Sequence, residues 1–263
     1  MSDATSEDKK AHVQDYFSRT AQSYVASASH SSGQDLQRLL EIGEWDVQQV
    51  ALDIATGGGH TALAVAPHVG HITVSDLTPT MLEAARAFLE KKGVTNADFQ
   101  VADAEALPFA DASFDRATCR IAPHHFPDVA RAVREVARVL KPGGLFLLID
   151  SVAPADPELD AFDNTVEKRR DPSHGRSHTL AEWRGFFAEA GLDIEQEEMF
   201  RRTHDYDSWT TISQLSAEGK RELEQFILGS EPHIQRYFAV TAREDGHLDH
   251  FSIDFVLLKG RKK

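Results

Sequence analysis

Between residues 50 and 150 the sequence alternates short apolar runs with longer amphipathic stretches, and this alternation restricts the fold more than any other feature. The apolar runs are typical of buried β-strands, and the stretches between them carry apolar residues at helical spacing. The expected strands cover Gln49 to Ala55, Ile72 to Asp76, Ala97 to Asp103, Ser113 to Arg120 and Leu145 to Asp150. Strands that alternate with helices of this length predict an α/β fold, a doubly wound parallel sheet with helices on both faces.

Several residues of the sequence predict where helices begin and end. The helix after the second strand is expected to have Thr78 as its N-cap, Pro79 at its first position and Gly93 just past its end. The stretch "DVARAVREVARVL" predicts an amphipathic helix that ends at "KPGG". Further along, "TLAEWRGFFAEAG" predicts a helix with a capping box made by Thr179 and Glu182.

The flanks of this region have a different pattern. Residues 8–44 are expected to form a helical cap, 48–150 a ligand-binding core, and 151–263 the second half of the sheet, all within one domain, 1–263. In the last part, "LDIEQEEMF" and "FSIDFVLLKG" predict strands, and residues 206–240 predict a helical insertion. From their position, the flanking helices are expected to cover the strand ends as a lid.

The first strand runs into three consecutive glycines, Gly57 to Gly59, in the stretch "DIATGGGH". Glycine loses more conformational entropy on folding than other residues, so three together need a reason. They are explained by positive φ angles, which a tight loop alone would require, or by a ligand that approaches the backbone closely. Strand–glycine–helix turns bind cofactors in doubly wound folds, so the ligand is preferred.

Two carboxylates follow the next strands at the same edge of the sheet. Asp76 can accept hydrogen bonds from ribose hydroxyls, or it can be a helix-entry carboxylate favoured by the helix dipole. Asp103 precedes Glu105 and the apolar residues Leu107 to Phe109, an arrangement that suits an adenine ring with its amine. An ordinary loop position is the alternative for Asp103.

Composition excludes several classes of function. The formal net charge of −14 argues against nucleic-acid or anionic-membrane partners, and the short basic stretches at Lys168–Arg170 and at the C-terminus do not reverse it. No apolar run reaches the roughly 20 residues of a membrane span, and "MSDATSEDKK" has no signal-peptide pattern. The single cysteine, Cys119, excludes an internal disulfide framework. A cytoplasmic location is expected.

Four stretches together carry a family resemblance: "ALDIATGGGH", "ITVSDLTPTMLEAARA", "VADAEALPFADASFD" and "REVARVLKPGGLFLLID". In this order and spacing the sequence resembles class I S-adenosylmethionine-dependent methyltransferases of the branch related to ubiquinone and menaquinone biosynthesis. The pieces "ATGGGH", "TCRIA" with "HHF", and "RDPSH" resemble a group of small bacterial members of unassigned substrate. The resemblance implies a Rossmann-like, mostly parallel seven-stranded sheet and methyl transfer from S-adenosyl-L-methionine, with S-adenosyl-L-homocysteine as product.

The resemblance also implies roles for individual residues. Those expected to contact the cofactor are Asp53, Ala55, Thr56, Gly57 and Gly59 in the glycine-rich motif, Asp76 and Leu77 at the ribose, Asp103, Ala104 and Glu105 at the adenine, Arg120 at the methionine portion, and Tyr24 as an aromatic that closes over it. One departure concerns Ala55 and Thr56, which stand where the family often has Gly-Cys or Gly-Ala. Alanine is small enough for the cofactor still to fit.

Candidate catalytic and substrate residues follow the fourth strand. Methyl transfer needs a base only when the acceptor arrives protonated. In "APHHF", His124 and His125 have a suitable reference pKa of about 6.5, although adjacent histidines in a loop are often plain surface residues. A small-molecule acceptor is expected, with His174, Arg176 and Trp209 as candidate contacts, or with "DPSHGRSH" as a simple flexible turn.

Other functions remain open at this point. Gly57, Gly59 and Ala62 satisfy a relaxed dinucleotide pattern, so an NAD(P)-dependent oxidoreductase is the rival enzyme. Against it stand Asp53 inside the first strand and the motifs "DAEALPF" and "LKPGG". A catalytically inactive protein that binds S-adenosylmethionine is the non-enzymatic alternative. The thirteen histidines lack metal-site spacing, so no metal is expected. The acceptor, the atom that is methylated and a homodimeric state are left undetermined.

Overall fold

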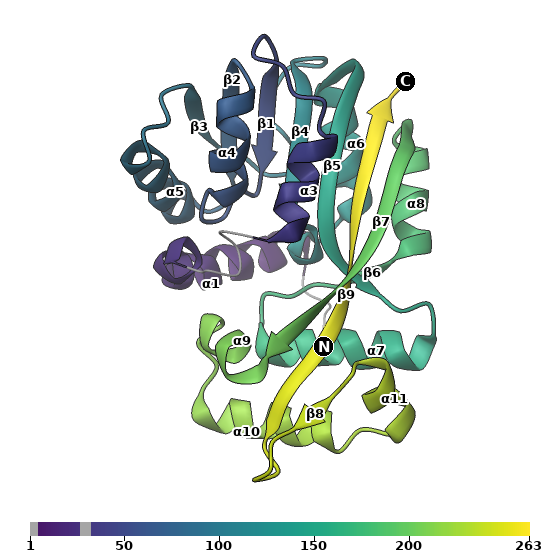
Figure 1. Cartoon of the computed structure of the whole chain (residues 1–263). Helices are drawn as coiled ribbons and strands as arrows, with labels where there is room; N and C mark the ends of the chain where they lie inside the picture. Colours follow the sequence, from purple (N-terminus) through teal and green to yellow (C-terminus); the bar gives the residue numbers. More distant parts are fainter. Residues whose placement is uncertain (1–4, 27–32) are drawn as a thin grey trace.

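Seven strands form the central sheet of the computed structural model in the order β3-β2-β1-β4-β5-β9-β7, and two short strands pair at its margins (Figure 1). The structure describes residues 5–26 and 33–263, and the side chains of residues 21–26 lie outside the described part. The strands are β1 Val50–Ile54, β2 His71–Asp76, β3 Ala97–Val101, β4 Phe114–Arg120, β5 Leu140–Ala153, β6 His178–Thr179, β7 Leu192–Asp205, β8 Thr241–Ala242 and β9 Leu248–Lys262. The described α-helices are α1 Ser6–Ala26, α3 Gln34–Ile42, α4 His60–Val65, α5 Pro79–Lys91, α6 Val129–Val139, α7 Pro157–Arg170, α8 Leu180–Glu189, α9 Tyr206–Ile212, α10 Ala217–Leu228 and α11 Pro232–Tyr237.

The sheet is mostly parallel, as predicted. The pairs β1–β2, β2–β3, β1–β4 and β4–β5 are parallel, whereas β9 pairs antiparallel with both β5 and β7. The strand order reverses at β1, because β2 lies on one side of it and β4 on the other. In open α/β sheets this switch point leaves a crevice at the carboxyl ends of the strands, where ligands bind.

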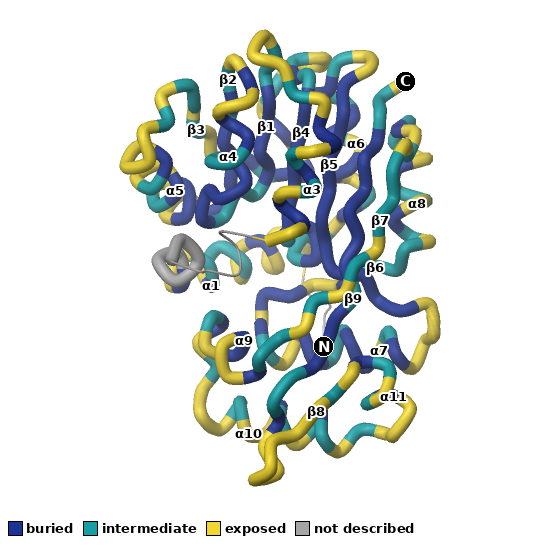
Figure 2. The backbone as a smooth tube through the Cα atoms, viewed as in Figure 1, coloured by how far each residue is buried: buried dark blue, intermediate teal, exposed yellow. Residues whose placement is uncertain are grey.

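Helices cover both faces of the sheet because its strands are apolar on both sides. On one face α6 and α8 pack against the sheet, with Trp183 and Phe187 fully buried. On the other face α3, α4 and α5 pack against it, with Leu39, Val65 and Leu89 fully buried. Figure 2 shows the central strands dark along most of their length.

A second layer of helices packs below the carboxyl ends of the parallel strands (Figure 1). There α7, α9, α10 and α11 enclose a third apolar core with the first half of β9, centred on Phe162, Ile227 and Phe251. The outer strands reach into this layer because β7 and β9 stay paired from Leu192 to Asp205. The pairing extends five residues beyond the stretch "LDIEQEEMF" from which β7 was predicted. Backbone pairing, and not the apolar pattern, determines where these strands end.

The predicted helix ends are partly confirmed. The capping box is present, since Thr179 N donates to Glu182 Oε2 at 2.7 Å and Glu182 N donates to Thr179 Oγ1 at 3.3 Å. Thr78 is the N-cap of α5, but its hydroxyl makes no capping bond. Instead, Thr78 N donates to the carboxylate of Asp76 at 2.9 Å. Among the described residues no helix has both the length and the apolar character needed to cross a bilayer.

Candidate active site

A cavity of about 320 Å³ lies at the carboxyl ends of β1, β2 and β4, bounded by α1 on one side and by α7 and α9 on another. Most of the residues singled out from the sequence line it, namely Ala55, Thr56, Gly57, Asp76, Leu77, Asp103, Ala104, Glu105, Arg120, His124, His125 and Trp209. The fold therefore brings together side chains from six separate stretches of the chain. Helices α1, α7 and α9 contribute residues to the lining of the cavity, and their action as a lid stays a prediction.

The glycine turn between β1 and α4 has left-handed backbone geometry. Gly57 has φ +54° and Gly59 has φ +83°, and Ala55 also lies in this region with φ +50°. A Cβ added to Gly57 would meet no atom within 4 Å, so this residue presents bare backbone to open space. A Cβ on Gly59 would lie 2.5 Å from Leu89 Cδ1, so this glycine permits α5 to pack closely. Only Gly57 of the two lines the cavity.

Asp53 lies behind the glycine turn and does not line the cavity. Its carboxylate accepts hydrogen bonds from the hydroxyls of Thr56 and Thr118, each at 2.6 Å. Burial raises the pKa of Asp53 to about 6, although the two hydroxyl bonds oppose the shift. Its position fits a residue that shapes the turn, and the expected direct contact with a cofactor is not supported.

Asp76 at the end of β2 connects the turn to the start of α5. Its carboxylate accepts a hydrogen bond from Gly57 N at 3.0 Å and another from Thr78 N at 2.9 Å. Burial raises the pKa of Asp76 to about 6 against the pull of these amide donors. Both readings of this carboxylate therefore have support, because it lines the cavity and also accepts a hydrogen bond from the N-cap amide at the start of α5.

The carboxylates of Asp103 and Glu105 are bridged by a lysine that the sequence analysis missed. Lys10 of α1 places its Nζ 2.7 Å from Asp103 Oδ2 and 2.7 Å from Glu105 Oε2, with only 11% of its side chain exposed. Gln14, one turn further on, donates a hydrogen bond from Nε2 to the carbonyl of Leu77 at 2.9 Å. These bonds hold α1 over the half of the cavity lined by Gly57, Asp76 and Asp103.

His124 forms a buried pair with Asp150 at the end of β5. Asp150 accepts from His124 twice, from the backbone N at 2.9 Å and from the ring Nδ1 at 2.6 Å. Burial alone would lower the pKa of His124, but the charge and hydrogen bond of Asp150 outweigh it and raise the pKa above 6.5. Because Nδ1 donates to the carboxylate, the neutral imidazole carries its lone pair on Nε2, the nitrogen that can accept a proton.

His125 has a different environment from its neighbour. Its Nδ1 lies 3.1 Å from the carbonyl oxygen of Ser173, to which it donates, and its ring contacts Phe17 edge-on. Burial and the adjacent His124 lower the pKa of His125 to about 3. A group with this pKa stays neutral near pH 7 and is a weak base.

The loop that contains "DPSHGRSH" supports His124 from behind. The backbone amides of Gly175 and Arg176 both donate to the carbonyl of His124, at 2.8 and 3.0 Å. His174 is buried against the His124 ring and donates from Nε2 to Asn164 Oδ1 at 3.1 Å. Arg176 points to the surface, where it pairs with Asp160 at 2.9 Å. Neither His174 nor Arg176 lines the cavity, so the structure gives no support to the prediction that they contact the substrate.

The half of the cavity below His124 combines an apolar and aromatic wall with polar and charged side chains, among them Glu167, Arg170 and Arg202. Trp209, the third candidate substrate contact, lines it and packs edge-on against Phe251 and under the guanidinium of Arg170. Phe17, Ile121, Phe126, Ile212 and Phe255 complete the apolar wall. Ile121 is a β-branched residue with φ +55°, so the backbone is strained where β4 meets this wall.

Tyr24 falls on the last turns of α1, and its side chain lies outside the described residues. The remaining cavity residues missed by sequence reasoning come from distant elements, above all Lys10 of α1 and Arg202 of β7. No motif signals them, because each reaches the cavity only through the packing of its helix or strand.

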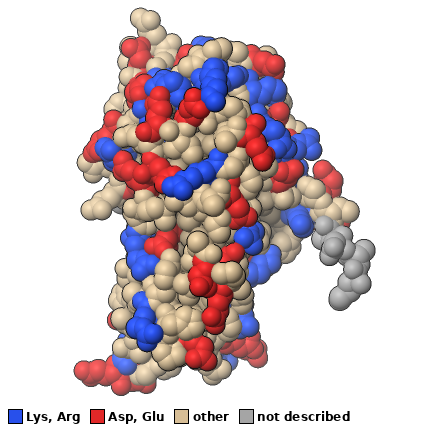
Figure 3. Space-filling model, turned by 90° about the vertical axis from the view of Figure 1, so that its right-hand side faces the viewer, with Lys and Arg blue, Asp and Glu red and all other residues tan. Residues whose placement is uncertain are grey.

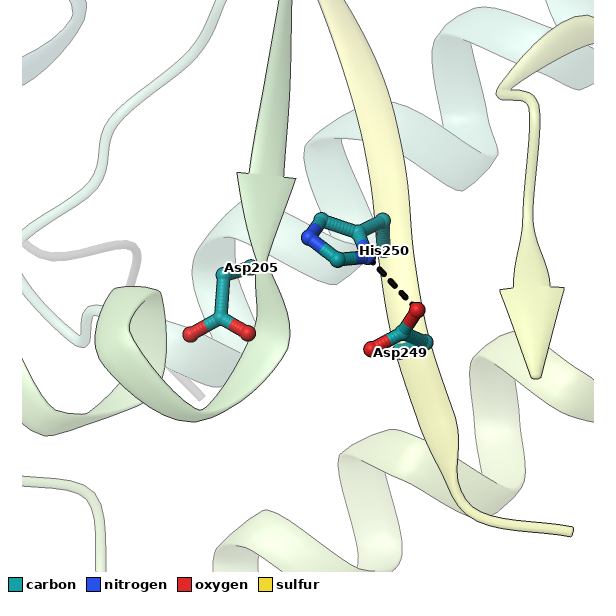
Figure 4. Close-up of side chains that lie close together, drawn as sticks. All are labelled: Asp205, Asp249 and His250. Atoms are coloured by element: carbon teal, nitrogen blue, oxygen red, sulfur yellow. Dashed lines mark ion pairs between the residues drawn. The ribbon is translucent and has the colours of Figure 1, made fainter. Parts of the chain in front are cut away.

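One group of metal-binding residue types occurs among the described residues, at the outer end of β9 (Figure 4). It consists of Asp205, Asp249 and His250, whose Nδ1 lies 2.8 Å from Asp249 Oδ2. Arg243 already pairs with Asp249 at 3.2 Å and approaches Asp205 at 3.9 Å. A cation in this position competes with a metal ion, so the group carries no metal assignment.

Charge on the surface is mixed, at least on the face that Figure 3 shows. There the basic and acidic side chains are interspersed. Ion pairs link the edge strand β7 to its neighbours, for example Arg184–Glu197 at 2.6 Å and Arg201–Asp254 at 2.8 Å. A mixed surface of this type offers no extended positive field for a polyanion.

Comparison with known proteins identifies the class. A family model described as a methyltransferase domain matches residues 52–148. The methyltransferase YcgJ of Bacillus subtilis is 39% identical over 247 residues, which cover 94% of this chain and 98% of that protein. Its crystal structure superposes with a TM-score of 0.84 over 87% of this chain and 98% of that chain. This chain therefore belongs to the S-adenosylmethionine-dependent methyltransferases.

Two further relatives refine this assignment. A Bacillus halodurans structure assigned to the methyltransferases is 40% identical, with a TM-score of 0.85 over 88% of this chain and 99% of that chain. The ubiquinone/menaquinone biosynthesis C-methyltransferase UbiE of Brucella anthropi is 40% identical over 114 residues, 42% of this chain and 43% of that protein. The resemblance drawn from the motifs is confirmed, and an NAD(P)-dependent oxidoreductase finds no support among these relatives.

Proposed function

We propose that this methyltransferase acts on a small molecule with an apolar body and an ionisable proton, and that His124 removes that proton as general base. One observation carries the proposal: His124 lines the cavity, and its ring is hydrogen-bonded through Nδ1 to the buried carboxylate of Asp150. Methyl transfer to an already deprotonated acceptor would not need such a pair.

Several features support S-adenosylmethionine as the cofactor. The open space beside Gly57 fits a ligand that lies against bare backbone, since any side chain there would fill the same space. Asp76 and Asp103 both line this half and offer carboxylate oxygens to hydroxyl and amine donors of the kind that adenosine carries. When bound, the cofactor supplies a methyl group that is already activated for transfer.

The protein residues then have three tasks. His124 accepts the acceptor's proton at Nε2, and the Asp150 carboxylate stabilises the resulting imidazolium through Nδ1. The aromatic wall of Phe17, Trp209 and Phe255 holds the acceptor body and displaces water from the reacting atoms. The loop at Gly175 fixes the backbone of His124, so the imidazole does not need to reorganise.

The test separates an active enzyme from a protein that only binds the cofactor. Purified protein is incubated with methyl-labelled S-adenosylmethionine and a metabolite library, and transfer of label is followed. Binding of S-adenosylhomocysteine is measured in parallel by calorimetry. Binding without transfer to any acceptor would favour the inactive binder, whereas binding of NADH with no binding of S-adenosylhomocysteine would reject the cofactor assignment.

A further inference from the structure

Strand β7 forms one edge of the sheet and pairs with β9 alone among the described strands. Its pairing with β9 is regular from Gln196 to Asp205, so alternate side chains of this part lie on the same face of the sheet. Glu197, Met199 and Arg201 therefore share one face. This is the face on which α8 lies, because Arg184 of α8 pairs with Glu197. A long edge strand offers unpaired backbone groups to which another strand can bind.

The middle of this strand carries an uncovered apolar side chain. Met199 is 48% exposed, although most apolar residues of the sheet are buried. Among the described residues the other large apolar residues with comparable exposure are Val47 and Val101. Val101 ends β3, the strand at the opposite edge of the sheet. Methionine is enriched in protein interfaces, where its flexible side chain packs against varied neighbours.

The residues on either side of Met199 have opposite charges. Glu197 lies two positions before it and Arg201 two positions after it, on the same face. A two-fold axis at Met199, perpendicular to the sheet, sets two copies of β7 antiparallel, with Glu197 of each copy opposite Arg201 of the other. An axis at Glu197 or at Arg201 would instead set like charges opposite each other, which destabilises a strand pair. The order of charges along β7 is therefore complementary to itself in one register.

Both charged residues can take a further partner. Arg184 donates to the two oxygens of Glu197 at 2.6 and 2.8 Å, and Arg201 donates to Asp254 at 2.8 and 3.0 Å. A carboxylate accepts more hydrogen bonds than these, and a guanidinium donates more. The side chain of Glu197 is 24% exposed and that of Arg201 39%. A pair across an interface can therefore form without breaking the pairs within the chain.

We propose that two copies of this protein form a symmetric dimer in which β7 pairs antiparallel with β7 of the second copy around Met199. Main-chain hydrogen bonds between the two strands supply the contact, and the charged residues set its register. The surface extends beyond the strand, since α8 lies beside Glu197 and the end of α11 beside Arg201, whose Nη1 donates to the carbonyl of Tyr237 at 2.8 Å. The two-fold axis brings α8 of one copy next to α11 of the other. The proposal does not depend on the proposed function.

Sedimentation equilibrium of the full chain tests the dimer. Met199→Lys sets two lysines opposite each other, whereas Val101→Lys, the matched control, changes a residue of similar exposure at the opposite edge of the sheet. We expect Met199→Lys to weaken the dimer by about tenfold or more and Val101→Lys to keep the wild-type dissociation constant. A wild-type protein that is monomeric at about 100 μM would overturn the proposal, and so would an unchanged dissociation constant in Met199→Lys.

Charge reversal tests the register. Glu197→Arg and Arg201→Glu each set like charges opposite each other in the dimer, and each is expected to weaken it by about tenfold. The double variant restores opposite charges across the interface but not the pairs with Arg184 and Asp254 within the chain. Its recovery of the dimer can therefore come only from the interface. A double variant as weak as the single ones would overturn this pairing of the strands.

A disulfide gives a second measurement, which decides the matter if a charged variant does not fold. The one natural cysteine, Cys119, is buried. Directly opposite residues of antiparallel strands have Cα atoms about 4.5–5.5 Å apart, a separation that a disulfide can bridge. Met199→Cys should therefore give a covalent dimer on oxidation, seen on a non-reducing gel, and Val101→Cys should not. Equal amounts of covalent dimer in the two variants would contradict the pairing at Met199.

Discussion

His124 makes activity and stability respond to pH in opposite directions. Its pKa in the folded protein lies above 6.5, so the imidazole is protonated and unable to act as a base at lower pH. We expect the rate of methyl transfer to rise with pH through this raised pKa. The expected acid limb is measured as kcat/KM between pH 5.5 and 9.

The same raised pKa has a consequence for folding. A histidine that binds its proton more tightly in the folded state stabilises the protein most below the unfolded pKa of about 6.5, and this contribution is lost as pH rises through the folded value. The melting temperature of wild-type protein should therefore exceed that of His124→Gln by more at pH 6 than at pH 8.5. An equal difference at both values would contradict the pairing of His124 with Asp150.

Substitutions should distinguish the two adjacent histidines. His124→Gln removes the proposed base and is expected to reduce kcat by about 100-fold or more with unchanged S-adenosylhomocysteine binding. Asp150→Asn removes the charge that raises the pKa of His124, so the acid limb should move to lower pH. His125→Gln is the control, and a larger loss of kcat in this variant than in His124→Gln would reverse the assignment.

Gly57 and Gly59, the two positive-φ glycines of the turn after β1, should respond differently to substitution by alanine. Both variants carry backbone strain of about 1 kcal/mol. Gly57→Ala is expected to cost little more in stability and to lose cofactor affinity, because its Cβ projects into open space. Gly59→Ala also forces a Cβ to within 2.5 Å of Leu89, so a loss of about 2–4 kcal/mol is expected. Denaturant unfolding measures the loss of stability, and calorimetry measures the loss of cofactor affinity. Equal free energies of unfolding for the two variants would contradict the different roles given to the two glycines.

At the scale of elements, α1 is held to the sheet edge by Lys10. Lys10→Met removes both ion pairs and leaves Asp103 and Glu105 as adjacent carboxylates without their shared cation. We expect faster amide hydrogen exchange in α1 than in wild-type protein, with little change in the central strands. Lys9→Met, on the exposed side of the same turn, is the matched control. Identical exchange rates in both variants would show that other contacts are enough to hold α1 against the sheet edge.

The elements of the core could be predicted because their signals are local. Pro79 and Gly93 mark the ends of a helix within a few residues, and the apolar runs of β1 and β4 are read from neighbouring positions. The site was only partly predictable, because its side chains meet through long-range packing. His174 was placed at the substrate because it belongs to the histidine- and arginine-containing stretch "DPSHGRSH". In the structure this loop packs the His174 ring against His124 instead. Arg202 carried no signal, since it lies among the last five residues of β7, beyond the stretch "LDIEQEEMF" that predicted the strand.

At the scale of the whole molecule, β9 connects parts of the fold that would otherwise be separate. It pairs with β5 through Leu145–Ser151 and with β7 through Leu192–Asp205, and its first half contributes to the core of the lower helical layer. A chain ending at Phe255 would lose most of the pairing with β5 and half of that with β7. We expect this truncation to abolish cooperative unfolding, measured by circular dichroism against temperature. A truncated protein with a wild-type melting curve would contradict this.

The position of β9 also has a consequence for synthesis in the cell. Strand β9 follows β5 and β7 along the chain and joins them in the sheet, and among the described strands β7 has no other partner. While β9 is still inside the exit tunnel, the nascent chain exposes one edge of β5 and both edges of β7, a condition that favours association with other chains. A product that stalls or terminates before β9 should therefore depend on chaperones, whereas the pairing of β9 with β5 and β7 closes this part of the sheet.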